Sequence, residues 1–480
     1  MILANYEPKE ILKHFEAISQ IPRGSGNEKA VSDFIAKFAR DLGHKTIQDD
    51  WHNLVIYKPA TLGYENKPAV ILQAHLDMVC EKNADTVHDF LVDPIRLYIE
   101  GDFIKAKGTT LGADNGLGTA ICMAVLEAND LQHPPIEVVL TTEEETGMAG
   151  AYNLDGSLLS GTRMVNLDNS RGLEIIMGCA AGTTVEYILP AEWETDVPET
   201  ETYRITIKGL TGGHSGGDIH KGRGNSLRIL GHILAALSEY ANLRIANVSG
   251  GMKLNAIPRE AVATISVPIA QVKKATTIFE ECRNDFAIQY RAVDSGLDIS
   301  WEATSADKLL TENCTNKLIA SLTLMPNGVQ CMSTELEGLV NASCNLGVIE
   351  TLADSIKISA FPRGAATFYN KQMEGQINKL ANLTGAKVTF MQRSPAWPYN
   401  PNSELLKIAQ ACYEPVFGHK AEVTAIHAGL ECGILAEKVP GLDIISYGPT
   451  NLDLHTPDER LSLSSTIKAW AVVKELLKAL

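Results

Sequence analysis

The sequence has few features that would place the protein in a membrane, outside the cell or on nucleic acid. Its nine cysteines form no CxxC pair and no even framework, which indicates reduced thiols in a cytosol. No stretch approaches the roughly 20 apolar residues of a membrane span, and the N-terminus lacks the basic start and apolar run of a signal peptide. A formal net charge of −16 argues against binding to nucleic acid or to an anionic membrane. We therefore predict a soluble, cytoplasmic protein.

The length and the pattern of apolar segments predict more than one domain. A chain of 480 residues is too long for one compact core, and its 45% hydrophobic and 21% charged residues are ordinary for a globular protein. Apolar runs at 69–74, 136–141 and 164–167 alternate with helix patterns and are typical of strands covered on both faces. Near residue 185 the order becomes strand, long apolar helix, strand. We predict an α/β domain, with a central mixed sheet covered by helices, from residues 1–184 and 400–480, interrupted by an α+β domain at 185–399.

Five acidic or imidazole side chains follow strand-like segments or a glycine-rich turn. Two histidines and three carboxylates are the ligand set of a two-metal site, in which one carboxylate bridges the ions. Side chains at the carboxyl ends of strands also meet in the crevice of an open α/β sheet. The last of the five lies near the C-terminus, so the domain that holds them must be discontinuous. They occur in the phrases QAHLDM, GADNGLG, TTEEETG, NLDN and LHTPDE: His75, Asp114, Glu145, Asp168 and His455.

Two neighbouring acids have the spacing of supporting groups. Asp77 is two residues from His75 on a strand, so both side chains point the same way and the carboxylate can fix the imidazole tautomer. Glu144, next to Glu145, is the proton acceptor that an attacking water needs.

Each phrase alone also has a simpler interpretation. These are a core histidine paired with a turn aspartate, a helix N-cap at Asp114, and a solvated loop of glutamates. It is the combination of the phrases that favours the metal site.

The segment near residue 25 predicts a helix start. Ser25 and Glu28 have capping-box spacing ahead of an apolar stripe at Val31, Phe34, Ile35, Phe38 and Leu42, and Gly43 ends the pattern.

The phrases together resemble those of the co-catalytic zinc peptidases, which include glutamate carboxypeptidase, aminoacylase and several dipeptidases. The resemblance rests on HxD, on EE-x-G and on the C-terminal histidine. It extends over essentially the whole chain and is closest to the family's aminoacyl-histidine dipeptidases. The turn KGTTLGAD departs from the family's commoner glycine-arginine-glycine form, which puts only local loop contacts in doubt. The resemblance implies a zinc-exopeptidase-like fold, an inserted lid domain, and two Zn²⁺ ions per chain. Co²⁺ or Mn²⁺ would also suit the ligand set.

The resemblance also implies a role for each residue of the site. An aspartate at position 168 goes with peptidases that act on dipeptides rather than on acyl-amino acids. In the implied arrangement Asp114 bridges the ions, His75 and Asp168 complete one ion, Glu145 and His455 complete the other, Asp77 orients His75, and Glu144 is the general acid/base.

Residues of the inserted domain would then contact the substrate. By resemblance, His214 in GLTGGHSGGD polarises the scissile carbonyl, and Asn255 and Arg363 hold the substrate carboxylate. His427 and Glu431 in HAGLECG would line the cleft near the substrate's amino end. The simpler interpretations are a loop histidine with local hydrogen bonds at 214 and an ordinary surface charge at 363.

These observations predict an enzyme that hydrolyses a broad range of unblocked dipeptides, including Xaa-His. Within the family, an N-acyl-amino-acid deacylase or carboxypeptidase would use the same metals. A non-catalytic metal- or peptide-binding protein would keep the fold but would have no need for Glu144. The resemblance leaves both a monomer and a homodimer open, and with them whether His214 acts in its own protomer or in its partner's.

Overall fold

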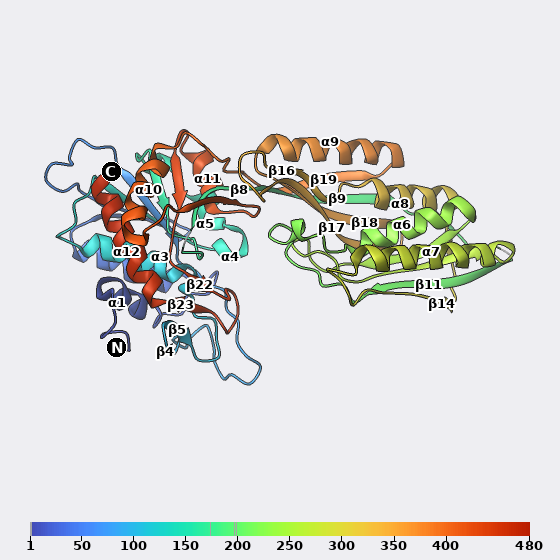
Figure 1. The fold of residues 1–480 in the computed structure, drawn as a ribbon, viewed down its shortest axis with the longest axis horizontal. Helices are drawn as coiled ribbons and strands as arrows, with labels where there is room; N and C mark the ends of the chain where they lie inside the picture. Colours follow the sequence, from blue (N-terminus) through green and yellow to red (C-terminus); the bar gives the residue numbers. More distant parts are fainter. Residues whose placement is uncertain (1, 173, 196, 198) are drawn as a thin grey trace. The chain divides into compact units, whose positions relative to one another are not determined.

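The computed structural model describes residues 2–172, 174–195, 197 and 199–480. The chain folds into two compact units, which Figure 1 shows coloured along the sequence. Unit 1 comprises Met1–Gly178, Tyr399–Ala425 and Leu430–Leu480, and unit 2 comprises Cys179–Pro398 and Ile426–Gly429. The functional division into a catalytic domain (1–184 and 400–480) and a lid (185–399) stays a prediction. Among the described residues, no helix has the length and apolarity needed to cross a lipid bilayer.

Unit 1 is built on a mixed sheet in the order β1-β2-β6-β3-β7-β21-β8-β20. At its centre, β3 runs parallel to both β6 and β7, and β21 runs parallel to β7, whereas β2 is antiparallel to β1 and β6. The strands of this sheet are β1 (Lys45–Gln48), β2 (Leu54–Lys58), β3 (Val70–His75), β6 (Ile136–Thr141), β7 (Arg163–Asn166), β8 (Glu174–Cys179), β20 (Glu422–Ile426) and β21 (Asp443–Ser446). A smaller sheet has the order β22-β23-β5-β4, with β4 (Leu97–Glu100), β5 (Phe103–Ala106), β22 (Asn451–Leu452) and β23 (Arg460–Ser462).

Helices cover the central sheet of unit 1. Every residue of β3 and β6 is buried, because strands at the centre of such a sheet are covered on both faces. Almost all of α3 is buried too, in keeping with a helix that is apolar all round. These features confirm the predicted α/β class with a central mixed sheet. The helical segments of this unit are α1 (Lys9–Ile18), α2 (Lys29–Asp41), α3 (Ala113–Glu127), α4 (Glu144–Gly147), α5 (Ala149–Asn153), the 3₁₀ turn η1 (Gly156–Leu158), α10 (Glu404–Phe417), α11 (Glu431–Lys438) and α12 (Leu463–Ala479).

The prediction of a capping box at the start of α2 is wrong. Glu28 itself is the N-cap residue and makes no side-chain capping bond. The hydroxyl of Ser25 donates instead to Asp77 Oδ2 at 2.7 Å. Phe34 and Leu42, two residues of the predicted apolar stripe, are exposed. Local spacing predicted the helix correctly, but the serine hydroxyl bonds to a residue distant in the sequence and not to the helix N-terminus.

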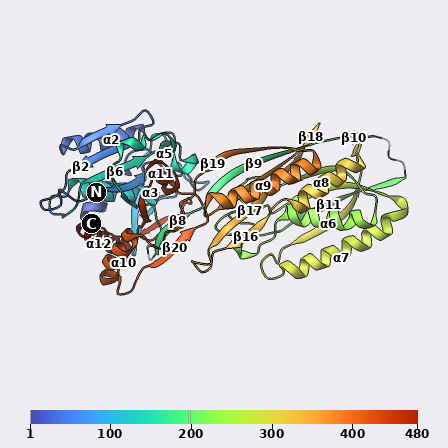
Figure 2. The ribbon, with the colours of Figure 1, turned by 90° about the horizontal axis from the view of Figure 1, so that it is seen from above.

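Unit 2 is an antiparallel sheet with helices packed on it. Its strand order is β14-β11-β13-β12-β17-β18-β9-β19, with β16 added to β17 and a separate β10–β15 pair. The strands are β9 (Ala181–Pro190), β10 (Trp193–Glu194), β11 (Thr200–Lys208), β12 (Arg244–Gly250), β13 (Ala261–Pro268), β14 (Asp298–Thr304), β15 (Leu309–Leu310), β16 (Gly328–Met332), β17 (Val340–Thr351), β18 (Ser355–Gly364) and β19 (Lys387–Ser394). The helical segments are η2 (Ile219–Lys221), α6 (Ser226–Tyr240), η3 (Ile269–Gln271), α7 (Val272–Tyr290), α8 (Glu312–Leu324) and α9 (Thr367–Thr384), and Figure 2 shows helices α6 to α9 lying over the strands.

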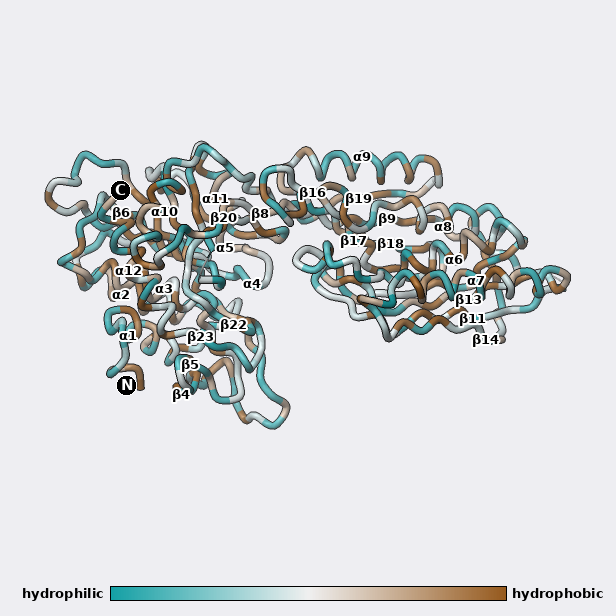
Figure 3. Tube along the Cα trace, viewed as in Figure 1, coloured by the Kyte–Doolittle hydropathy of each residue, from teal (hydrophilic) through white to brown (hydrophobic). Residues whose placement is uncertain are grey.

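Side-chain alternation explains why this sheet has one covered face. Along β18, Ile356 and Ile358 are buried, whereas Lys357 between them pairs with Glu186 at a partly exposed position. Figure 3 shows hydrophilic and hydrophobic stretches alternating along α9, whose buried side includes Ile377. An antiparallel sheet with one covered face and amphipathic helices confirms the predicted α+β character of this region.

Candidate metal centre

The predicted metal ligands of unit 1 lie where its central strands end. Strand β3 ends at His75, and its neighbours β6 and β7 end just before Glu145 and Asp168. Because β3 is parallel to both neighbours, the three carboxyl ends lie at the same edge of the sheet. The strand register therefore brings side chains that are far apart in the sequence to one edge.

The five residues converge around one carboxylate. His75 Nε2 lies 3.2 Å from Asp114 Oδ1 and 3.5 Å from Asp168 Oδ1. His455 Nε2 lies 3.3 Å from Asp114 Oδ2 and 3.2 Å from Glu145 Oε2. Two of the three candidate ion-binding groups among the described residues, His75–Asp114–Asp168 and Asp114–Glu145–His455, share Asp114 and face different oxygens of it. The third group is His75, Glu144 and Glu145. The structure brings all five together, and their roles as ligands stay a prediction.

Asp114 is not the N-cap of the following helix. The N-cap position of α3 belongs to Gly112, which has a left-handed φ of 69°, and Asp114 and Asn115 have non-helical backbone angles and are joined by a cis peptide bond. A side-chain capping bond comes from Asn115, whose Oδ1 accepts from Gly118 N at 3.1 Å. The N-cap interpretation of Asp114 is therefore wrong, and its carboxylate faces the histidines.

Asp77 holds both sides of the site. Its Oδ1 lies 3.3 Å from His75 Nδ1 and accepts from Glu144 N at 3.1 Å, while Oδ2 accepts from Glu145 N at 3.2 Å. Burial by itself would raise the pKa of Asp77, but the His75 imidazole and the Ser25 hydroxyl outweigh burial and lower that pKa to about 2. Asp77 is therefore an anion that holds the start of the short helix α4 and lies beside His75, and its role in orienting that histidine stays a prediction.

The density of partly buried acids at this edge fits divalent cations. Burial raises the pKa of Glu144 well above its usual value, and the charges of Asp168, Glu145 and Glu431 raise it further. Burial also raises the pKa of Asp168, to about 7. Glu145 Oε1 is buried and has no hydrogen-bond partner in the described part of the chain. Carboxylates this close together need positive charge, and a set of imidazole and carboxylate donors suits zinc or a similar ion.

Glu431 is buried against the strands that end at this edge. Its side chain is 1% exposed, and Oε2 accepts from Gln73 Nε2 at 2.6 Å and from Thr141 Oγ1 at 2.7 Å. Gln73 Oε1 in turn accepts from Asn166 Nδ2 at 2.5 Å. The carboxyl therefore ties together the ends of β3, β6 and β7, while a contact of Glu431 with substrate stays a prediction.

Unit 2 gathers a second set of the predicted residues. Arg363 is 6% exposed, its Nη2 lies 3.5 Å from Ser215 Oγ, its guanidinium lies over the Phe361 ring, and its Nε has no hydrogen-bond partner among the described residues. No carboxylate of the described residues pairs with this guanidinium, and burial lowers its pKa to about 10. His427 belongs to the same unit, and its Nε2 lies 2.7 Å from Ser343 Oγ. The interpretation of Arg363 as a surface charge is therefore wrong.

Backbone hydrogen bonds in its loop define the tautomer of the His214 imidazole. Backbone N–H groups of Gly216 and Gly217 donate to His214 Nδ1 at 3.2 and 2.9 Å. A ring nitrogen that accepts carries no proton, so in the neutral ring the proton is on Nε2. Ser215 N donates to the Asn255 carbonyl at 2.8 Å, which holds the Asn255 segment beside this loop.

Sequence reasoning missed several buried polar residues that support the site. Arg23 is buried, and its Nη1 donates to the carbonyls of Leu76 and Asp77 at 2.9 and 3.1 Å. Glu459, in the same LHTPDE phrase as His455, accepts backbone hydrogen bonds from the turn before Asp114. The phrase itself was the only available signal for Glu459, and nothing near Arg23 in the sequence indicates its partners.

Comparison with known proteins gives the family. Residues 71–479 match peptidase family M20/M25/M40. The cytosol non-specific dipeptidase of Escherichia coli (strain K12) is 37% identical over 477 residues, covering 99% of this chain and 98% of that protein. The crystal structure of aminoacylhistidine dipeptidase from Vibrio alginolyticus has a TM-score of 0.93 at 38% identity, covering 100% of this chain and 98% of that one. The structure of aminopeptidase PepT from Bacillus cereus has a TM-score of 0.58 at 15% identity, covers 99% of both chains, and shows a likeness of fold alone. The chain belongs to peptidase family M20/M25/M40, which confirms the resemblance seen in its motifs and identifies it as a hydrolase of peptide bonds.

Proposed function

We propose that this protein is a two-zinc dipeptidase that hydrolyses a broad range of unblocked dipeptides, including Xaa-His. The observation that carries the proposal is the pair of donor groups that share Asp114, with Glu144 beside them. The relatives named as a non-specific dipeptidase and an aminoacylhistidine dipeptidase support the substrate class.

The proposed chemistry divides between the ions and the chain. Two bound Zn²⁺ ions would supply Lewis acidity, which activates a water and polarises the scissile carbonyl. Glu144 accepts the proton of the attacking water and returns it to the departing amine. Asp77 Oδ1 accepts from the backbone N–H of Glu144 and so holds the backbone that carries the proposed base.

Recognition of the substrate falls to residues with unused hydrogen-bonding capacity. A buried guanidinium without an anion is unfavourable, and a substrate carboxylate would supply the missing partner of Arg363. The planar guanidinium fork can also pair with both oxygens of such a group. His214 offers Nε2–H as the donor that the oxygen of a scissile carbonyl needs.

The test is amino-acid release from Ala-His and from N-acetyl-His by metal-stripped protein, with zinc added back stepwise. Release from Ala-His alone, saturating at two zinc ions per chain, is the expected result. Release from N-acetyl-His would move the protein to the deacylases. Tight binding of two ions and of Ala-His without release of amino acids from either compound would mean a binding protein.

A further inference from the structure

The turn that leads into Asp114 is held by a single carboxylate. Glu459 Oε2 accepts from the N–H groups of Leu111 and Gly112 at 2.8 and 2.9 Å. Glu459 Oε1 accepts from Ala113 N at 3.0 Å and from Asp114 N at 3.3 Å. Four consecutive amides therefore converge on one side chain, which is 2% exposed.

Other polar groups fix that carboxylate and the far side of the turn. Asn451 Nδ2 donates to Glu459 Oε1 at 2.9 Å. On the carbonyl side, Arg23 Nη2 donates to Gly112 O, while its Nη1 holds the backbone at Leu76 and Asp77. A Cβ at Gly112 would lie 2.7 Å from Arg23 Nη2, so this glycine leaves room for the guanidinium. Buried charges of opposite sign thus hold the two faces of one turn.

These bonds fix the backbone that carries Asp114. Glu459 accepts from the N–H groups of residues 111–114, including that of Asp114 itself, and Asn115 Oδ1 accepts from Gly118 N. The two carboxylate oxygens of Asp114 lie 3.2 Å from His75 Nε2 and 3.3 Å from His455 Nε2. The position of the turn therefore sets where this carboxylate lies between the two histidines.

The same side chain also joins two distant segments of the chain. Glu459 is four residues beyond His455, and its own N–H closes a turn onto Thr456 O at 3.1 Å. The Leu111 contact spans 348 positions in the sequence. Displacement of Glu459 would therefore change the position of His455 relative to Asp114.

We propose that Glu459 is a positioning residue for the metal pair, because it holds the backbone of the 111–114 turn that carries Asp114 and ties that turn to the segment of His455. This inference rests on the proposed two-metal function. It concerns the placement of two ligands, and Glu459 itself contacts neither substrate nor ion.

Glutamine cannot replace this glutamate in hydrogen bonding. Each carboxylate oxygen accepts from two backbone N–H groups, and glutamine has only one oxygen. Whichever way the amide is turned, two backbone N–H groups face an NH₂ group. Glu459→Gln therefore tests the contact with almost no change in side-chain volume.

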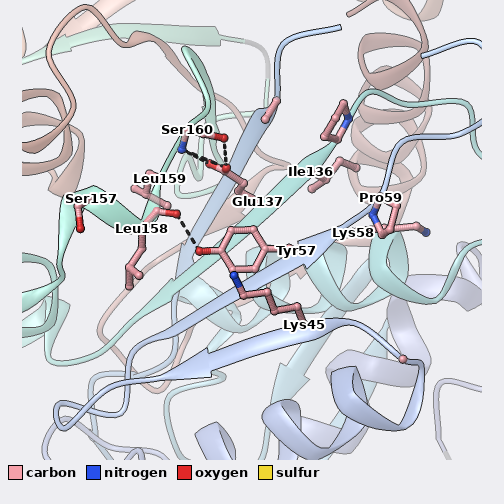
Figure 4. Close-up of a pocket in the computed structure, with 13 residues that line it drawn as sticks. Lys45, Tyr57, Lys58, Pro59, Ile136, Glu137, Ser157, Leu158, Leu159 and Ser160 are labelled. Carbon is pink, nitrogen blue, oxygen red and sulfur yellow. Dashed lines mark hydrogen bonds between the residues drawn. The ribbon is translucent and has the colours of Figure 1, made fainter. Parts of the chain in front are cut away.

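Glu137 is a matched control at the other end of β6. It is 3% exposed and accepts from Ser160 N, Ser160 Oγ and Gly161 N, at 3.0, 2.5 and 3.0 Å. Figure 4 shows Glu137 near Tyr57 and Leu158. These residues line a cavity of about 640 Å³, and none of the predicted metal ligands lines it. Glu137→Gln breaks a comparable cluster of buried hydrogen bonds without touching Asp114 or His455.

The experiment measures metal affinity separately from activity. Full-length wild type, Glu459→Gln and Glu137→Gln are stripped of metal, titrated with Zn²⁺ against a chelating dye, and loaded with Co²⁺ for absorption spectra. We expect Glu459→Gln to weaken the more weakly bound ion about 10- to 100-fold, the range for groups that orient metal ligands, and to change the Co²⁺ spectrum. Glu137→Gln should lower the melting temperature but keep wild-type affinity and spectrum.

The outcomes separate this inference from the proposed function. Wild type that binds fewer than two ions would refute the proposed two-metal function. Two ions in wild type with unchanged affinity and spectrum in Glu459→Gln would overturn the inference alone, as would equal losses of affinity in both variants. If Glu459→Gln yields no folded protein, Glu459→Asp decides: its charged but shorter side chain should give an intermediate loss of affinity, and wild-type affinity would overturn the inference.

Discussion

The two units of this protein differ in the sign of their partly or fully buried charges: unit 1 has a cluster of carboxylates, and unit 2 has a buried guanidinium. In unit 1, carboxylates gather at a sheet edge, and the anion Asp77 is held there by backbone amides of Glu144 and Glu145. In unit 2, Arg363 is buried and no described carboxylate pairs with it. Buried charge without a partner is unfavourable in either sign. The difference supports the proposal that unit 1 binds cations and that Arg363 of unit 2 binds an anion.

The largest effect is expected at the proposed base of unit 1. Glu144→Gln should lower kcat about 10²- to 10⁴-fold, the usual contribution of a general base, because the amide cannot accept the proton of water. Zinc stoichiometry should stay at the wild-type value. Glu143→Gln, in the same run of glutamates, is the control and should keep its turnover. Near-normal kcat in Glu144→Gln would refute the assignment of the base.

The matching test in unit 2 concerns the carboxylate. Arg363→Lys should lower kcat/KM for a dipeptide roughly 10- to 100-fold, because hydrogen bonds to charged groups contribute about 1.5–3 kcal/mol and a lysine cannot form the bidentate pair. Steady-state kinetics with the same dipeptide as a C-terminal amide should show little difference between variant and wild type. Arg393→Lys, whose guanidinium pairs with Glu374, serves as the control. Equal losses on acid and amide would mean that Arg363 does not recognise the carboxylate.

A smaller effect tests whether loop anchoring in unit 2 is independent of metal. Asp294 accepts from Thr211 N and Gly224 N, both at 2.7 Å, and so closes the loop that carries His214. Asp294→Asn keeps one acceptor and should lower the free energy of unfolding by about 1–3 kcal/mol, as measured by urea unfolding. Zinc affinity should not change. The control is Asp298→Asn at an exposed ion pair. Loss of zinc affinity in Asp294→Asn would contradict the proposal that all the zinc ligands belong to unit 1.

The smallest effect is a pH dependence from His427. Burial, followed by the positive charges of Arg363 and His214, lowers the pKa of His427 to about 3 from its usual 6.5. Below pH 6.5 the unfolded chain takes up a proton that the folded chain does not, so folding stability falls with pH over the window from 6.5 to 3. The contribution should be about 1.4 kcal/mol lower at pH 5.5 than at pH 8. Urea unfolding of metal-free protein should show this slope reduced in His427→Gln, and identical slopes would contradict the prediction.

The strands and the convergence of the candidate ligands could be predicted because both carry local signals. The run at 136–141 was predicted with the bounds that β6 has, since a strand buried on both faces reads as a continuous apolar segment. His75, Glu145 and Asp168 each stand at or just beyond the end of such a run, where function is expected in an α/β sheet. The predicted capping box was wrong because local spacing does not reveal distant partners. The Ser25 hydroxyl donates to Asp77, 52 positions away, and not to the first turn of α2.

The sequence by itself determined the fold class, the family and the candidate ligands, since these follow from apolar periodicity and from short phrases. Only the tertiary structure decided which buried groups hold those ligands. Gln73 meets Glu431 across 358 positions, and Leu111 meets Glu459 across 348. Such contacts depend on the order of the strands and on how they are connected, and the local spacing of residues does not reveal either. The candidate ligands and the proposed base lie in recognisable phrases, whereas the residues that hydrogen-bond to their backbone and neighbours can be identified only in the folded chain.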